Sequence, residues 1–122
     1  MAPSLPIPNG SFRMTSLSTH VLDTTHGRPA SGIAVRLEAA DGALLFEGVT
    51  NADGRCLGLP GLSIGQYRIA FAVAAYFRGL GVALADPPFL DVVTIAFGVA
   101  DTGHYHVPLL VSPYGYSTYR GS

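Results

Sequence analysis

In Gln66-Tyr67-Arg68-Ile69-Ala70-Phe71-Ala72-Val73, every second side chain is large and apolar. This period of two predicts a β-strand, because successive side chains point to opposite faces of a strand. Tyr67, Ile69, Phe71 and Val73 are therefore expected on one buried face. A strand with one apolar face needs a second apolar layer to pack against, so the rest of the chain must supply it.

Other short runs indicate further strands. In residues 33–38, Ile33, Val35 and Leu37 alternate with polar side chains. The remaining runs rich in apolar or β-branched residues are 17–23, 44–50, 55–57, 89–97, 105–112 and 115–119. Turn signals separate them, among them Asp41-Gly42 and Asp53-Gly54. Strands about 8–12 residues apart with turns between them favour an antiparallel β-sandwich, and hence the all-β class.

One segment departs from the strand pattern. Residues 74–78, Ala-Ala-Tyr-Phe-Arg, favour a short helix that Gly79 or Gly81 ends. The consecutive Pro87 and Pro88 then interrupt regular structure before the next strand. The sequence thus predicts a single short helix among the strands.

The chain carries few charges for its size. Charged side chains make up 12% of the 122 residues and hydrophobic ones 48%, whereas about 25% charged is usual. We therefore expect a homo-oligomer that buries part of this apolar surface between subunits; an apolar, poorly soluble monomer is the alternative. The expected organisation is one domain at residues 15–122 after a disordered extension at residues 1–14.

Composition also excludes several classes of protein. The net charge is −1 and the seven cationic residues form no cluster, so nucleic-acid binding is not expected. Cys56 is the only cysteine, which excludes an intrachain disulfide. No apolar run reaches ~18 residues, so no membrane span is expected. Residues 1–13 lack the pattern of a secretion signal, and residues 120–122 are not the Ser-Lys-Leu peroxisomal address, which favours the cytoplasm.

The C-terminal part of the chain is rich in hydrogen-bonding side chains. Residues 104–122 hold four of the six tyrosines and two of the four histidines, together with Arg120. Chain ends are usually frayed and carry little function. This density predicts that the end of the chain contributes to a functional site.

The four histidines differ in their expected positions. His26 lies in a turn and is expected in a solvated loop. His20 lies within a predicted strand, where Ser18, His20 and Leu22 share one face. His104 and His106 are two residues apart and are expected to point to the same side. Because the pKa of histidine is about 6.5, these residues suit proton transfer near neutral pH.

Other chemistries remain open from the residues alone. A His-x-His pair with a third histidine also suits a three-histidine zinc site in a metal-binding structural protein. Arg55 follows the Asp53-Gly54 turn, and its guanidinium could bind a carboxylate or carbonyl group, or form a surface ion pair. A serine hydrolase is disfavoured, because Gly-x-Ser-x-Gly does not occur. Cys56 is expected to be a buried core thiol.

Four motifs, in this order, make the sequence similar to a known family. They are His20-Val21-Leu22-Asp23 with the following Gly27-Arg28-Pro29-Ala30, then Asp53-Gly54-Arg55, His104-Tyr105-His106-Val107-Pro108-Leu109-Leu110 and Tyr119-Arg120-Gly121-Ser122. Over residues 17–122 the chain resembles the transthyretin-like family, and within it the enzymatic branch, the 5-hydroxyisourate hydrolases. The hormone-carrier branch has lysine at the position of His20 and threonine at that of His106, and lacks the Tyr-Arg-Gly-Ser ending.

The resemblance implies a fold and an assembly. It implies a transthyretin-like β-sandwich of two four-stranded antiparallel sheets with one short helix. It also implies a homotetramer, a dimer of dimers, whose active sites lie in the channel where the dimers meet. The low charge content agrees with such an assembly. A transthyretin-like carrier of small aromatic ligands is the alternative within the same fold.

The resemblance also implies the reaction and the residues that perform it. The reaction is hydrolysis of 5-hydroxyisourate to 2-oxo-4-hydroxy-4-carboxy-5-ureidoimidazoline, on the route from urate to allantoin. The catalytic positions are His20, Arg55, His106 and Ser122, and the substrate-binding positions are His20, Arg55 and Tyr119. His104 is expected to have a supporting role. The resemblance implies no metal and no organic cofactor.

Overall fold

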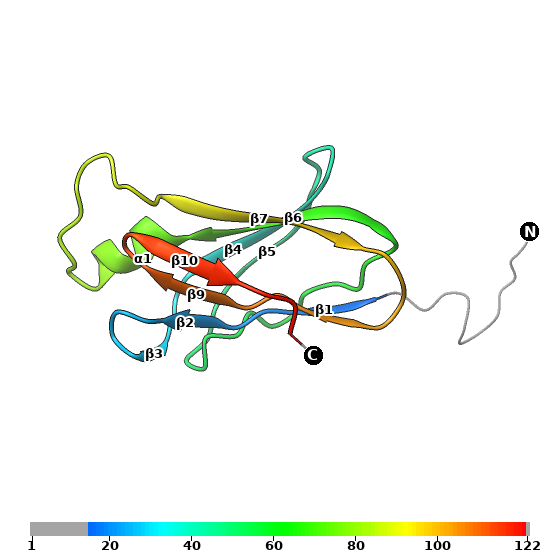
Figure 1. Cartoon of the computed structure of the whole chain (residues 1–122), viewed down its shortest axis with the longest axis horizontal. Helices are drawn as coiled ribbons and strands as arrows, with labels where there is room; N and C mark the ends of the chain where they lie inside the picture. The colour runs from blue at the N-terminus through cyan, green and yellow to red at the C-terminus, as the bar shows by residue number, and fades with distance from the viewer. Residues whose placement is uncertain (1–14, 122) are drawn as a thin grey trace, which may run out of the picture.

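Two four-stranded sheets face each other in the computed structural model, which describes residues 15–121 (Figure 1). One sheet has the strand order β5-β4-β6-β7 and the other β10-β9-β2-β3, and β1 pairs with β8 beside them. The elements are β1 (Ser16–Ser18), β2 (Val21–Asp23), β3 (Arg28–Pro29), β4 (Ala34–Ala39), β5 (Leu44–Val49), β6 (Gly65–Ala72), α1 (Val73–Gly79), β7 (Val92–Val99), β8 (His104–His106), β9 (Leu109–Ser112) and β10 (Gly115–Thr118). The expected transthyretin-like sandwich is confirmed. The predicted boundary between residues 14 and 15 falls at the edge of the described residues and stays a prediction.

The alternation in β6 and β4 defines the core as predicted. Ile69 and Phe71 of β6 are fully buried, and so are Val35 and Leu37 of β4. The two strands pair in antiparallel register, so their apolar side chains form one continuous surface. The opposite sheet contributes the fully buried Val21, Leu109 and Val111. Cys56 is buried in the same core, as expected.

Two predicted strands are interrupted at matching places. The run 17–23 divides into β1 and β2 around Thr19 and His20, and the run 105–112 divides into β8 and β9 around Val107 and Pro108. Pro108 has no backbone N–H and so cannot continue the ladder. The flanking residues bridge the gap, since the Val107 N–H donates to Ser18 O at 2.9 Å and the Leu109 N–H donates to His20 O at 2.9 Å.

The strand directions differ from the prediction in two sheets. β1 pairs with β8 in the two-stranded sheet, and β2 with β9 in a four-stranded sheet, both in parallel, whereas an antiparallel arrangement was expected throughout. The sheet β5-β4-β6-β7 is antiparallel at every pair. Strands some 88 residues apart in sequence have no turn between them to set their direction, so local patterns did not reveal this pairing.

The strand predicted at residues 89–97 begins later than expected. β7 begins at Val92, and Phe89 is 73% exposed in the preceding loop. The Asp91 carbonyl accepts hydrogen bonds from the N–H groups of Val73 and Ala74, at 3.1 and 3.0 Å. Asp91 therefore holds the start of α1 instead of extending the strand. The helix itself is confirmed at Val73–Gly79, and none of the described helices is long and apolar enough to cross a membrane.

His26 lies in an exposed turn, as predicted, and it is also held there by a buried carboxylate. Its Nδ1 lies 2.6 Å from Oδ2 of Asp23, a residue only 1% exposed. Tyr76 Oη donates to the same carboxylate oxygen at 2.7 Å. A buried carboxylate needs such partners, because leaving it unpaired away from water is costly. His26 thus belongs to a structural cluster between the turn and α1.

Candidate active site

His20 and Arg55 are brought together by backbone pairing. They form an isolated antiparallel bridge, in which the Val21 N–H donates to Gly54 O at 2.8 Å. Gly54 has φ of 77°, and a Cβ there would lie 2.5 Å from Val21 O and 3.2 Å from His20 Cδ2. Only glycine therefore allows this turn to approach the strand so closely. The predicted run 55–57 forms this single bridge and no strand.

The loop that presents Arg55 is closed by Asn51. Its Oδ1 accepts hydrogen bonds from the N–H groups of Asp53 and Arg55, at 2.9 and 3.1 Å. Its own N–H donates to Arg55 O at 2.8 Å. These bonds restrict the backbone on both sides of the turn, so the backbone of Arg55 has a defined position next to His20.

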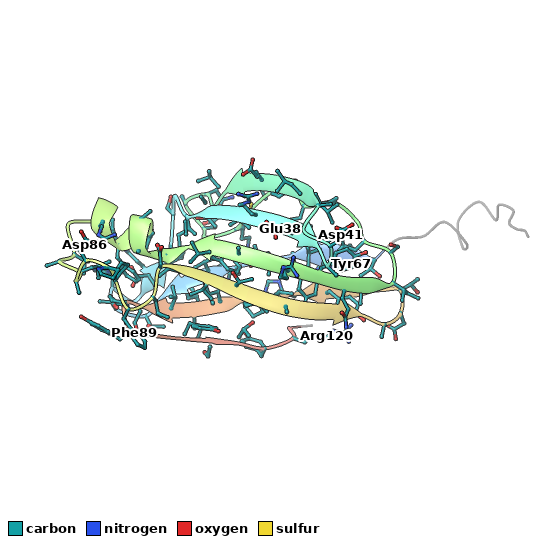
Figure 2. The ribbon with its side chains drawn as sticks, turned by 90° about the horizontal axis from the view of Figure 1, so that it is seen from above. Glu38, Asp41, Tyr67, Asp86, Phe89 and Arg120 are labelled. Atoms are coloured by element: carbon teal, nitrogen blue, oxygen red, sulfur yellow. The ribbon has the colours of Figure 1, made fainter. Side chains whose placement is uncertain are left out.

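The C-terminal segment crosses over His106. The Gly121 N–H donates to His106 O at 2.8 Å, and a Cβ on Gly121 would lie 2.5 Å from His106 Cδ2. Thr118 Oγ1 donates to Pro108 O at 2.7 Å at the end of β10. The Arg120 guanidinium lies 3.8 Å from the centre of the Tyr105 ring, a geometry that a cation–π attraction stabilises. Figure 2 shows Arg120 at the end of the sandwich opposite to Phe89.

The surroundings of His106 lower its pKa. Burial lowers its pKa below the usual value, and the nearby Arg55, His104 and His20 lower it further. Each of these groups disfavours a second proton on the imidazole. His106 is therefore neutral at neutral pH and has a lone pair available as a base.

Two serines that the sequence reading did not single out contact the histidines. Ser16 Oγ lies 2.6 Å from Nδ1 of His104, and Ser18 Oγ lies 2.8 Å from Nε2 of the same ring. Ser18 Oγ also lies 2.7 Å from Nδ1 of His106. The period of two already put Ser18 on the face of His20, but the partner strand could not be identified without the parallel pairing.

Tyr119 lies beside this cluster in a separate hollow. It is 60% exposed and lines a pocket of about 250 Å³, together with Tyr105, Val107 and Arg120. None of His20, Arg55 and His106 lines that pocket. The structure thus brings three of the predicted site residues together and leaves Tyr119 at the margin, while Ser122 lies outside the described residues.

The zinc alternative has no support from residues 15–121. Within that range, no group of three His, Cys, Asp or Glu side chains is placed to hold a metal ion. His104 and His106 point to the same side, as predicted, but their ring nitrogens bond to serine hydroxyls. The geometry is that of a hydrogen-bonded histidine cluster.

This architecture defines a transthyretin-like β-sandwich with a histidine–arginine cluster at the points where its parallel strands are interrupted. The chain belongs to the HIUase/Transthyretin family, whose model matches residues 17–121. The 5-hydroxyisourate hydrolase of Mesorhizobium japonicum is 52% identical over 113 residues, covering 87% of this chain and 91% of the relative. That of Caulobacter vibrioides is 51% identical over 115 residues, covering 89% of this chain and all of the relative.

Solved structures agree with this membership. Klebsiella pneumoniae 5-hydroxyisourate hydrolase superposes with a TM-score of 0.77 at 37% identity, covering 89% of this chain and 100% of that one. An (S)-allantoin synthase has a TM-score of 0.83 at 41% identity, covering 90% of this chain, which spans only 44% of that longer chain. Sea bream transthyretin in complex with thyroxine has a TM-score of 0.76 at 32% identity, covering 86% of this chain and 93% of that one.

Proposed function

We propose that this protein hydrolyses 5-hydroxyisourate to 2-oxo-4-hydroxy-4-carboxy-5-ureidoimidazoline, using His20, Arg55 and His106. One observation carries the proposal. A backbone bridge joins His20 to Arg55, and the parallel pairing of β1 with β8 puts His106 on the strand beside them, in a chain about half identical to 5-hydroxyisourate hydrolases. The enzyme acts in urate degradation as a cyclic amide hydrolase.

The chemistry starts from the neutral imidazole of His106. Its lone pair accepts a proton from a water molecule while the water oxygen attacks the C6 carbonyl carbon of the substrate. The C6–N1 bond then breaks, the departing N1 receives the proton, and C6 becomes a carboxyl group. Atoms and charge balance with one water consumed and no other reactant.

Arg55 and His20 act on the substrate itself. The guanidinium of Arg55 carries a permanent positive charge and two parallel N–H donors, which suits the negative charge that develops on oxygen during attack. His20 lies across the backbone bridge from Arg55 and contacts the substrate ring. Together they orient the carbonyl carbon toward the water held by His106.

The C-terminal segment completes the site in this proposal. Tyr119 and Ser122 supply hydrogen-bonding groups to the substrate. The approach of Gly121 to His106 supports this arrangement, because it holds the C-terminal segment against the histidine cluster. The contact of Arg120 with Tyr105 holds the segment in place.

We also propose a homotetramer, a dimer of dimers, in the cytoplasm. Among residues 15–121, β7 and β10 each pair with a strand on only one side, and apolar side chains are exposed near them. These are Phe89, Val92, Tyr114 and Tyr116. Pairing with further copies would cover both the strand edges and these side chains. Light scattering on the purified protein tests the proposal, and a monomer at micromolar concentration would refute it.

The activity is tested by generating 5-hydroxyisourate in situ with urate oxidase and following its ultraviolet absorbance. We expect the decay to be faster with this protein than without it, and to depend on protein concentration. Decay at the spontaneous rate would refute the enzyme assignment. Boiled protein and a His106→Ala variant serve as controls for non-specific acceleration.

A carrier of small aromatic ligands is the second candidate. The structural likeness to transthyretin in complex with thyroxine favours it. The two functions separate experimentally, because a carrier would bind an aromatic ligand stoichiometrically without changing the decay of 5-hydroxyisourate. Calorimetric titration with thyroxine beside the decay assay distinguishes them.

A further inference from the structure

β1 and β8 place serine hydroxyls directly beside imidazole rings. The two strands are parallel, with Ser16 opposite His104 and Ser18 opposite His106. Because side chains alternate along a strand, all four share one face. The residues between them, Leu17 and Tyr105, point the other way into the core and are 7% and 5% exposed. Core packing thus fixes which side chains face the site.

These side chains form one continuous hydrogen-bonded chain. It runs from Ser16 Oγ to His104 Nδ1, from His104 Nε2 to Ser18 Oγ, and from Ser18 Oγ to His106 Nδ1, with distances of 2.6, 2.8 and 2.7 Å. Every link is short enough for a well-formed bond. The exposed end is Ser16 and His104, and the half-buried end is His106.

The chain has two arrangements in which the Ser18 hydroxyl proton lies within it. In each, Ser18 donates to one ring nitrogen and accepts from the other. If Ser18 donates to His104, it accepts a hydrogen bond from the Nδ1–H of His106, and Nε2 of His106 carries a lone pair. If Ser18 donates to His106, Nε2 carries the proton and cannot act as a base.

The proposed function selects the first arrangement. Nδ1 of His106 is occupied by Ser18 Oγ at 2.7 Å, so Nε2 is the ring nitrogen left to take a proton from water. A base needs a lone pair on that nitrogen, which puts the single proton of the neutral ring on Nδ1.

We propose that Ser18 and His104 are positioning residues that hold His106 with its proton on Nδ1 and its lone pair on Nε2. The inference rests on the proposed function, because it concerns how the base of that reaction is set. Nε2 of His104 accepts a hydrogen bond from the Ser18 hydroxyl. This leaves a lone pair of the Ser18 oxygen directed toward His106. Orientation of a catalytic base by a third group is a general requirement of this kind of chemistry.

The tautomer of His106 matters because its surroundings keep the ring neutral. Arg55, His104 and His20 are the titratable or charged groups that act on His106, and all of them keep it neutral. A neutral imidazole exists in two tautomers, and only one has a lone pair on Nε2. Without Ser18, the ring would populate both tautomers and could also rotate.

The test compares Ser18→Ala, Ser18→Thr, His104→Gln and His104→Leu in the full-length protein. Thr keeps a hydroxyl at the same branch point, and Gln keeps a polar group near the position of Nε2. Ser112→Ala is the matched control, since Ser112 bonds only locally near the β9–β10 turn. Imidazole ¹⁵N chemical shifts report the tautomer of His106 directly, and the decay assay reports kcat and KM.

We expect Ser18→Ala and His104→Leu to lower kcat about tenfold, the effect of losing one ordinary hydrogen bond, with KM within about twofold. In both, the ¹⁵N spectrum should shift from a single Nδ1–H tautomer toward a mixture. Ser18→Thr and His104→Gln should recover most of both properties, and Ser112→Ala should match the wild type.

Two results would overturn the inference. One is a wild-type His106 that carries its proton on Nε2. The other is a Ser18→Ala protein with wild-type kcat and an unchanged spectrum. A wild-type protein that shows the Nδ1–H tautomer but does not accelerate 5-hydroxyisourate decay would refute the proposed function instead. The two failures are therefore separable, and the His104 variants decide the case if Ser18→Ala does not fold.

Discussion

Gly121→Ala should disable the site while leaving the sandwich intact. A Cβ at this position would lie 2.5 Å from His106 Cδ2 and 3.1 Å from both Cβ and Cγ of the same side chain. Ordinary contacts begin near 3.4 Å, so either the C-terminal segment or the imidazole must move by about 1 Å. The obstructing atoms belong to a ring held on a strand, so the segment is the part that moves.

The expected loss follows from that displacement. A misplacement of about 1 Å in a catalytic arrangement can cost about a hundredfold in rate, so we expect kcat/KM to fall by about that factor. The hydrogen bond from Gly121 N–H to His106 O, 2.8 Å long, would be lost with it. Since Gly121 lies outside the core, the free energy of unfolding should change by less than about 1 kcal/mol.

The assay combines the ultraviolet decay of 5-hydroxyisourate with thermal unfolding followed by circular dichroism. Gly79→Ala is the matched control, because a Cβ there meets no atom within 4 Å, and it should retain wild-type activity. A Gly121→Ala protein with wild-type kcat/KM would show that the segment does not need to approach His106. A large fall in unfolding temperature would show that the segment is a structural element.

Three further predictions concern the same chain. Deleting residues 120–122 should abolish the acceleration of 5-hydroxyisourate decay while the circular dichroism spectrum stays that of the wild type. Full activity in the truncated protein would show that the active site does not include the C-terminal residues. The lowered pKa of His106 means that kcat/KM should rise with pH through a midpoint below about 6.5, the usual histidine value, and then level off; a midpoint above that value would exclude His106 as the base. Although burial acts to raise the pKa of Asp23, hydrogen bonds from Tyr76 and His26 hold it below its usual value, so the stability it contributes is present at neutral pH and is lost as the pH falls through the folded-state pKa. Asp23→Asn should accordingly lower the free energy of unfolding at pH 7 by about 1–3 kcal/mol and flatten its acid dependence, as measured by urea titration at pH 3–7; an unchanged acid dependence would contradict this.

Local patterns in the sequence predicted the layers of the fold, because each strand carries its own period of two. Burial of Ile69 and Phe71 follows from alternation within eight consecutive residues. The parallel pairing of β1 with β8 could not be inferred in the same way. It depends on how segments about 88 residues apart meet, which is decided by the packing of both sheets.

Only part of the candidate site could be predicted, because contacts between distant segments carry no local signal. His20, Arg55 and His106 are candidates because a family resemblance marks them, although spacing alone would have allowed an ion pair or a zinc site. Ser18 carries no such signal, since a serine within a strand is ordinary. Its contact with His106 at 2.7 Å becomes visible only once the register of β1 against β8 is known.

The interruptions in the two parallel strands explain how one end of a sandwich becomes a site. His106 O accepts from Gly121 N–H, and this bridge keeps the register in which β10 pairs with β9. The C-terminal segment therefore follows the strand past Pro108, which has no N–H to donate, and residues 119 and 120 lie between the two paired stretches. On the other strand, the Val21 N–H donates to Gly54 O where β2 begins, next to the bridge between His20 and Arg55. Two distant segments, a glycine turn and the C-terminal segment, thus dock by backbone pairing without disturbing the core. A Pro108→Ala variant tests this argument: if β8 and β9 fuse, the pairing should extend through Tyr119 and Arg120, and activity should fall because these residues leave their present positions, whereas unchanged activity would show that the interruption is incidental.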